Sequence, residues 1–267
     1  MGDTDSWRAP RRLALLAFGV VAVLYLVGPM LVVIPMSFTA ANILSWPPEG
    51  FSTQWYEKMV EDPQWSRGFV NSLQVAVLTA LLSSVLGTLG ALGIVRGRFP
   101  GKALANALIL SPLIVPVIII AIGFFAFFSI ARLTGSLPGL VLAHTALAVP
   151  FVIINVGTIL RTMDRNLELA AASLGADPIR TFRRVTFPLI LPGVLAGALF
   201  AFITSWDEVV VSIFMTTTRF RTLPVEMWEQ VRQVVDPTVA AVATVVMAVT
   251  TTVLVFVFVV RRRVVVR

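Results

Sequence analysis

Cysteine is absent from the sequence, histidine occurs once, and charged residues are scarce. Without cysteine the chain can form no disulfide, no thiolate nucleophile and no zinc-finger site, and a single histidine argues against a histidine-rich metal centre. Charged residues make up 13% of the 267 residues, whereas a soluble domain has about 25%. Hydrophobic residues make up 57% and the mean hydropathy is +0.90, which excludes a disordered chain. We therefore exclude a soluble globular domain and expect the chain to be surrounded by lipid.

Signatures of catalysis and of nucleotide binding are also missing. The nearest approach to a phosphate-binding Walker loop is Gly101-Lys102-Ala103, which lacks the following Ser or Thr and has Arg96 where the first glycine belongs. The sequence has no plausible Ser/His/Asp or Cys/His constellation. We therefore predict that the chain is not an enzyme by itself and that it binds no metal and no cofactor.

Long apolar runs account for most of the chain. A helix that crosses the hydrocarbon needs roughly 20 apolar residues, and lipid tolerates only helices or closed barrels. These runs do not alternate as barrel strands do. The sequence therefore predicts an all-α integral membrane protein with six transmembrane helices, at about 13–38, 68–95, 103–131, 133–160, 185–214 and 237–260. The first run is longer than the 7–15 apolar residues of a cleavable signal peptide, so we expect it to be retained.

The basic residues predict the orientation of these helices. Most of the 21 Lys and Arg lie in the tail 1–12, in the connections after the second and fourth runs, and in the tail 261–267. The positive-inside rule places this side, and with it both termini, in the cytoplasm. The segment 39–66 is then periplasmic and the loop 161–188 is cytoplasmic. Because the charge follows the topology, it does not support nucleic-acid binding.

Small residues recur in the predicted helices, and prolines interrupt them. Gly87 and Gly90 lie in the second helix, and Gly193 and Gly197 form a GxxxG pair in the fifth. Small residues let helices approach closely. Tight packing and kinked helices around a pathway are both consistent with this pattern.

The cytoplasmic loop 161–188 carries a complete signal for two short helices. Good helix formers fill 166–174, and Gly175 is placed at the C′ position that ends a helix. Asp177 is a natural N-cap, and Pro178 suits the first helical position after it. Apolar residues that could make buried contacts are Leu169, Leu174, Ile179, Phe182 and Val185. We interpret the loop as a docking element for another protein; the alternative is a solvated basic linker.

The same loop resembles the EAA motif of ABC-importer permeases, in which Glu-Ala-Ala is followed by a glycine and later by a Leu-Pro ending. The matching residues are Ala170, Ala171, Gly175, Val185, Phe187 and Pro188. Leu169 stands at the family's Glu position, with Glu168 one residue earlier. The resemblance implies that the loop is the coupling helix, seated in a groove of an ATPase subunit. The residues it implies for this interface are Glu168, Ala170, Ala171, Gly175, Asp177, Pro178, Thr181, Phe182 and Arg183.

Over nearly its whole length the chain resembles the permease subunits of spermidine/putrescine-type ABC importers. Matching segments are Ser-Trp-Pro-Pro-Glu-Gly-Phe-Ser at 45–52, Ser-Pro-Leu-Ile-Val-Pro at 111–116, Ser-Trp-Asp-Glu at 205–208 and Thr-Leu-Pro-Val-Glu-Met-Trp at 222–228. One departure is Val117, where many relatives have an acidic residue. The resemblance implies a type I (MetI-like) importer permease fold, a place in the bacterial inner membrane, and half of a translocation pathway, with polyamine as the leading substrate.

The resemblance also implies partners. They are a dimer of ATPase subunits, which would hold ATP and Mg, a second homologous permease subunit and an extracytoplasmic substrate-binding protein. An importer of the same type for an amino-acid-like or aminophosphonate solute remains an alternative. A stand-alone secondary carrier or channel, or a membrane scaffold, would leave the loop 161–188 without a role.

Two acidic residues, Asp207 and Glu208, lie near the outer end of the fifth helix. Ionisable groups near membrane depth usually face a cavity or a partner, and an anionic patch on the pathway would attract an amine. The alternative is a salt bridge to Arg219 or Arg221. Further candidates for the pathway are Ser205, Trp206 and Asn71, although Trp206 could equally be an interfacial anchor. For His144, in the fourth helix, we expect an interhelical hydrogen bond.

Overall fold

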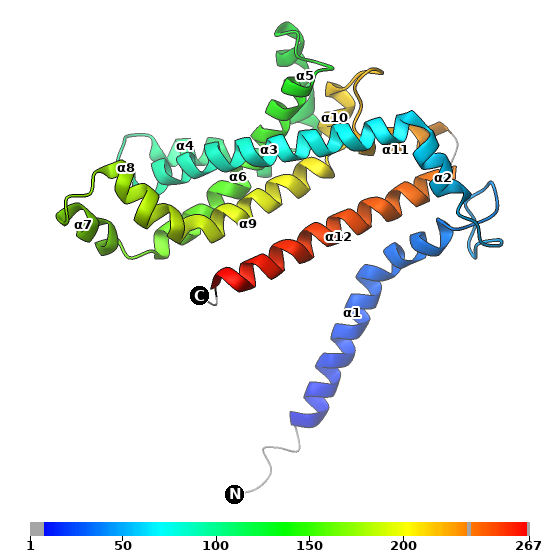
Figure 1. Cartoon of the computed structure of the whole chain (residues 1–267), viewed down its shortest axis with the longest axis horizontal. Coiled ribbons are helices and arrows are strands. Elements are labelled where there is room, and N and C mark those ends of the chain that lie inside the picture. Colours follow the sequence, from blue (N-terminus) through cyan, green and yellow to red (C-terminus); the bar gives the residue numbers. More distant parts are fainter. Residues whose placement is uncertain (1–7, 234–235, 266–267) are drawn as a thin grey trace, which may run out of the picture. The chain divides into compact units, whose positions relative to one another are not determined.

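A computed structural model of the chain is shown in Figure 1. It describes residues 8–233 and 236–265, with side chains for 13–233, 236–253 and 255. Every regular element in these ranges is a helix, which confirms the expected all-α class. The described residues form two compact units, one of residues 8–62 with 230–233 and 236–248, and one of residues 63–229 with 249–265.

Three long helices, α3 (Pro63–Arg96), α6 (Leu137–Thr162) and α9 (Phe187–Trp206), run side by side in the larger unit (Figure 1). The helix α6 packs against both of the others, and it is the most deeply buried of the three apolar spans. It begins after two residues with positive φ, Arg132 and Gly135, so it starts later than the expected 133.

Glycines make the close approach of these helices possible. A methyl group on Gly87 of α3 would lie 2.5 Å from Val152 Cβ, and one on Gly197 of α9 would lie 2.7 Å from Val152 Cα. Gly193, the other half of the GxxxG pair, has the backbone oxygen of Asn155 at 3.0 Å from the same position. These small residues therefore serve tight packing in the described structure, as close helix contacts in membranes require.

The third predicted helix is broken. The residues 103–131 form α4 (Lys102–Leu110), a 3₁₀ turn η1 (Ser111–Leu113) and α5 (Val117–Ile130). The axis bends by 103° between the two parts. The expectation of one continuous helix was wrong because Pro112 and Pro116 each remove a helical N–H donor and crowd the preceding turn.

The fifth predicted helix, 185–214, is also broken. Before α9 the chain forms α7 (Asn166–Ser173), α8 (Pro178–Thr181) and a π-helical stretch η2 (Phe182–Thr186). After α9, residues Asp207–Val209 interrupt the helix, and α10 (Val210–Met215) follows. The interruption has a local cause: the side chain of Glu208 accepts a hydrogen bond from Val211 N at 2.8 Å, as residues that begin a new helix do.

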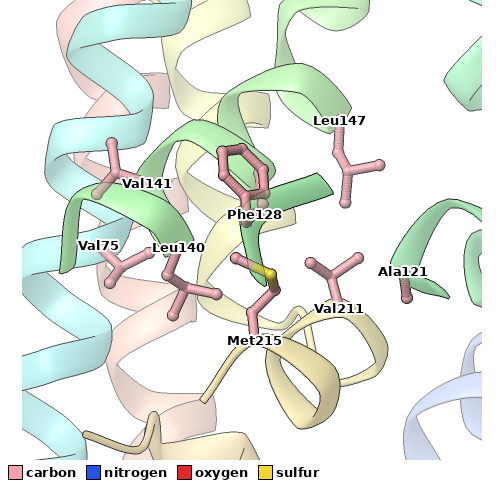
Figure 2. Packing of buried hydrophobic residues seen from close by; sticks show 9 residues of the cluster. Val75, Ala121, Phe128, Leu140, Val141, Leu147, Val211 and Met215 are labelled. Carbon is pink, nitrogen blue, oxygen red and sulfur yellow. The ribbon is translucent and has the colours of Figure 1, made fainter. Parts of the chain in front are cut away.

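A hydrophobic core holds α10 to its neighbours (Figure 2). It contains Leu140, Val141 and Leu147 of α6, Val211 and Met215 of α10, Ala121 and Phe128 of α5, and Val75 of α3. The broken helices therefore remain packed in the larger unit. A hydrogen bond from Gly135 N to Met215 O also joins the turn after α5 to the end of α10.

The smaller unit contains α1 (Arg8–Met36), α2 (Gln54–Glu61) and the beginning of α12 (Thr238–Val265). The expected periplasmic segment 39–66 ends at Asp62, because α3 begins at Pro63 rather than at 68. It folds on itself around Trp55, whose Nε1 donates to Thr39 O at 2.7 Å.

Four described helices are long and apolar enough to cross a membrane, or five if the bent pair counts as one span. They are Leu13–Met36, Pro63–Arg96, Leu137–Thr162 and Pro178–Trp206, with Lys102–Leu113 and Val117–Ile130 as the pair. The apolar part described for α12, Thr238–Val253, is shorter than a span, so the expected sixth span stays a prediction.

The predicted tails have more helix than expected. α1 begins at Arg8, inside the predicted tail 1–12, and α12 continues to Val265, inside the predicted tail 261–267. Residues 1–7 and 266–267 lie outside the described residues. Between α10 and α12 the chain forms a further short helix, α11 (Leu223–Gln233).

Candidate coupling loop and transport pathway

The loop between α6 and α9 has the two short helices that its capping residues predict. Gly175 ends α7 with φ of +81°, and it donates to Ala172 O at 2.9 Å while Ala176 donates to Ala171 O at 3.1 Å. This pair of bonds is the glycine-terminated Schellman motif. Asp177 then caps α8, accepting from Arg180 N at 2.8 Å.

The loop exposes apolar side chains. The exposed fraction is 58% for Leu169, 89% for Leu174 and 71% for Ile179. Exposed large apolar side chains gathered in one short segment indicate a contact site. Phe182 differs, because it is partly buried against the core cluster around Val152 and Leu160. The surface open to a partner is therefore centred on α7 and the start of α8.

Basic residues lie beside this apolar surface. Arg180, Arg183 and Arg184 line a cavity of about 590 Å³ together with Asp177 and Ile179. The other residues that the EAA resemblance implies for an interface differ in their exposure. Ala170 and Pro178 are exposed, Ala171 and Thr181 are half-buried, and Gly175 has open space where a side chain would be.

Glu168 points away from this exposed surface. Its Oε1 accepts from Thr186 Oγ1 at 2.9 Å, and its Oε2 lies 3.4 Å from Arg96 Nη2 at the end of α3. Thr186 is buried and leads directly into α9. Glu168 thus joins the loop to two of the three central helices. The sequence offered no signal for Arg96 and Thr186 as its partners, because they are far from it along the chain.

His144 makes the expected interhelical hydrogen bond, and in fact makes two. Its Nδ1 lies 2.8 Å from Ser205 Oγ in α9, and its Nε2 lies 3.1 Å from Ser212 Oγ in α10. All three side chains are buried. The histidine therefore fixes α10 to α6 and α9 across the break at Asp207.

Two of the candidates for the transport pathway, Ser205 and Trp206, are buried. Ser205 is held by His144, and Trp206 is 3% exposed between Phe69 and Phe202, with ring centroids at 5.5 and 5.8 Å. Neither side chain offers a surface to a solute in this structure, and Trp206 is not at a lipid-facing position either. Both instead support the end of α9 from which Asp207 follows.

The two acids at this end differ in their surroundings. Asp207 is exposed at the C-cap of α9, whereas Glu208 is partly buried and occupied with capping α10. One of the two arginines considered as partners, Arg221, instead lies 3.4 Å from Glu226. Asp207 is therefore the acid with a side chain free to face solvent.

Asn71 has a structural partner. Its Nδ2 donates to Arg221 O at 2.8 Å, and the neighbouring Ser72 Oγ accepts from Leu223 N at 2.8 Å. Gln64 Nε2 also donates to the buried Glu226. Together these groups hold the segment before α11 against the first turns of α3.

Known proteins resemble this chain over most of its length. Residues 83–266 match the family model of the binding-protein-dependent transport system inner membrane component. The spermidine/putrescine transport system permease protein PotC of Haemophilus influenzae is 31% identical over 230 residues, 86% of this chain and 89% of the relative. The putrescine transport system permease protein PotI of Escherichia coli is 31% identical over 255 residues, 92% and 89% of the two chains.

A solved structure shares the fold. In the crystal structure of a bacterial ABC transporter that imports the acidic polysaccharide alginate, one chain superposes with a TM-score of 0.72. The match covers 97% of both chains at 16% identity. A chain of a bacterial alginate ABC transporter, in complex with an alginate pentasaccharide-bound periplasmic protein, superposes with a TM-score of 0.70 and 17% identity over 95% of this chain and 93% of that chain. This chain belongs to the family of inner membrane components of binding-protein-dependent transport systems.

Proposed function

We propose that this chain is one transmembrane subunit of an ATP-driven importer of polyamines in the bacterial inner membrane, with both termini in the cytoplasm. A second homologous permease would complete the pathway, two ATPase subunits would supply the energy, and an extracytoplasmic binding protein would deliver the solute. The chain itself would hold no cofactor, since ATP and Mg would bind to the ATPase subunits.

The observation that carries the proposal is the loop between α6 and α9. It is a capped pair of short helices that exposes Leu169, Leu174 and Ile179. A water-exposed linker has no need of this construction, and a docking element does. Because Glu168 joins the loop to α3 and α9, a movement of the docked ATPase would move these helices as a rigid body.

Polyamine as the substrate rests on two observations. The two curated relatives reported above are permeases for spermidine and putrescine or for putrescine. In this chain Asp207 is exposed at the end of α9, where a carboxylate favours a cationic amine over a neutral or anionic solute. Glu208 supports it by fixing the turn into α10.

The test is ATP hydrolysis by the complex that co-purifies with this chain, reconstituted in lipid nanodiscs. Hydrolysis is measured with the loaded binding protein and spermidine, putrescine or an aminophosphonate. We expect stimulation by a polyamine and loss of stimulation in Leu174→Ser and Ile179→Ser. The variant Ser173→Ala, at an exposed position of the same loop, is the matched control and keeps the stimulation.

Each of the other outcomes would contradict a different part of the proposal. Stimulation by the aminophosphonate alone keeps the importer and removes polyamine as its substrate. Transport in proteoliposomes without any ATPase would identify a stand-alone carrier. Stimulation that survives both loop substitutions would remove the loop from the interface.

A further inference from the structure

A second cavity lies at the ends of three helices of the larger unit and has no lining residue in common with the cavity of the coupling loop. Its volume is about 500 Å³. The residues that line it are Ile94 and Val95 in the last turn of α3, Lys102, Ala103 and Asn106 in the first turns of α4, and Arg161 at the end of α6. None of these residues has a role in the function proposed above.

The polar groups of this cavity are suited to an anion. The lining residues given above include two cations and one amide but no carboxylate. Lys102 Nζ donates to Gly97 O at 3.0 Å, which holds the ammonium group at the cavity and leaves two of its N–H donors for another acceptor. Asn106 lies one turn further along the same face of α4. Neither Lys102 nor Arg161 takes part in an ion pair within the described part of the chain.

The apolar part of the lining indicates where this anion comes from. Ile94, Val95 and Ala103 form the other wall. Both α3 and α6 are long and apolar enough to cross a membrane, and they end beside the cavity, at Arg96 and Thr162. The cavity therefore lies where two spans leave the hydrocarbon, which is the depth of the lipid phosphates. Basic pockets between helices at this depth bind anionic headgroups.

We propose that the cavity between Lys102 and Arg161 is a binding site for the phosphate headgroup of an anionic phospholipid. The phosphate would lie between the ammonium and guanidinium groups, with Asn106 donating to the headgroup and the acyl chains leaving along the apolar wall. A lipid bound there would tie α4 to the ends of α3 and α6, next to the start of the coupling loop.

The experiment measures lipid retention by the complex that contains this chain. The complex is exchanged into nanodiscs of phosphatidylglycerol or of phosphatidylcholine, released into detergent, and its retained lipids are counted by native mass spectrometry. The test variant combines Lys102→Gln with Arg161→Gln. The control is Arg98→Gln, which removes an exposed charge from the connection between α3 and α4 but does not line the cavity.

We expect the wild type and Arg98→Gln to retain phosphatidylglycerol in preference to phosphatidylcholine. The double variant should bind phosphatidylglycerol more weakly by about fivefold for each charge removed. Its thermal unfolding in phosphatidylcholine is compared with that of the wild type. If the double variant does not fold, the single variant Arg161→Gln, at an exposed side chain, replaces it with about half the logarithmic effect.

Three results would overturn the proposal. Equal losses in Arg98→Gln and the double variant would mean general attraction to a charged surface. Displacement of the lipid by millimolar inorganic phosphate would identify a site for a soluble anion. Binding of phosphatidylglycerol only after removal of the ATPase subunits would identify the cavity as a protein contact. None of these results depends on which solute the complex transports.

Discussion

Glu168 and Arg96 are separated by more than seventy positions in the sequence, yet Glu168 Oε2 lies 3.4 Å from Arg96 Nη2. The other carboxylate oxygen accepts from Thr186 Oγ1. Both charged side chains are about four-fifths buried, with exposed fractions of 22% and 21%. The loop is thus tied to the helix bundle by a glutamate that stands one residue before the position at which the EAA motif has its own, while Leu169 at that position is exposed.

We expect Glu168→Ala to weaken the link between ATP hydrolysis and transport. It would remove the acceptor of Thr186 and leave the guanidinium of Arg96 without its acid, at a cost of about 1–3 kcal/mol in the free energy of unfolding. The measurement is the amount of polyamine transported per ATP hydrolysed in proteoliposomes. The exchange variant Arg96→Glu with Glu168→Arg should recover part of the coupling. If it recovers none, the pair serves stability alone.

The position of Gly175 allows a test of loop geometry without a steric clash. The methyl group added by Gly175→Ala would meet no atom within 4 Å, but the φ of +81° at this position disfavours any side chain. We expect a cost of about 1 kcal/mol in the free energy of unfolding. We expect lower stimulation of ATP hydrolysis by the loaded binding protein. Gly101→Ala is the matched control, since Gly101 has φ of +78° and equally open surroundings outside the loop. Equal losses in both variants would contradict a special role for the loop.

Packing of the central helices predicts opposite effects for two glycines of α3. Gly87→Ala would place its methyl group 2.5 Å from Val152 Cβ and should destabilise the protein by about 1–3 kcal/mol. Gly93→Ala meets nothing within 4 Å and should be neutral or slightly stabilising, because alanine favours the helix. Thermal unfolding in detergent measures both. The double variant Gly87→Ala with Val152→Gly removes both side-chain atoms that the new methyl group would meet. It should therefore lose less stability than the sum of the two single losses, and additive losses would argue against this contact.

The two acids after α9 should respond differently to neutralisation. Asp207→Asn removes an exposed charge, and we expect a higher KM for spermidine in proteoliposomes with little change in stability. Glu208→Gln keeps an oxygen that can cap α10, so we expect a smaller effect on KM. The effect of Asp207→Asn should shrink at high salt, because exposed charges are screened. An unchanged KM in Asp207→Asn would remove this residue from the pathway.

In the smaller unit, the lowered pKa of Asp236 predicts that stability depends on pH. Burial tends to raise the pKa of its carboxyl group, but the hydrogen bonds and charge of Lys58 and the bonds from Thr238 outweigh this and lower the pKa below 3.8. The stabilisation is therefore fully present above pH 3.8 and is lost as the pH falls through the lowered pKa. Because Lys58 is half-exposed, its share is small, at most about 1 kcal/mol.

The measurement compares the melting temperatures of the wild type and Lys58→Gln between pH 3 and pH 6. The wild type should melt higher near pH 6, and the difference should shrink toward the acid end. A difference that is constant over this range would show that Lys58 acts through packing rather than through its charge.

Local chemistry made several features of this protein predictable from the sequence. The caps at Gly175 and Asp177 depend on backbone groups only a few residues away. The end of α7 and the start of α8 could therefore be predicted from the sequence. The long apolar runs likewise predicted helices, because a backbone in hydrocarbon must satisfy its hydrogen bonds internally. His144 was expected to bind across helices for the same reason: a lone polar group in an apolar environment needs a partner.

The sequence by itself determined the helical class, the apolar spans and the capped loop, since these depend on composition and on neighbours along the chain. The tertiary structure decided which distant groups meet. It turned Glu168 toward Arg96 and Thr186, buried Ser205 and Trp206, and bent the chain by 103° between α4 and α5. Prolines show where a helix can break, but the angle and the partners depend on packing between segments far apart in the sequence.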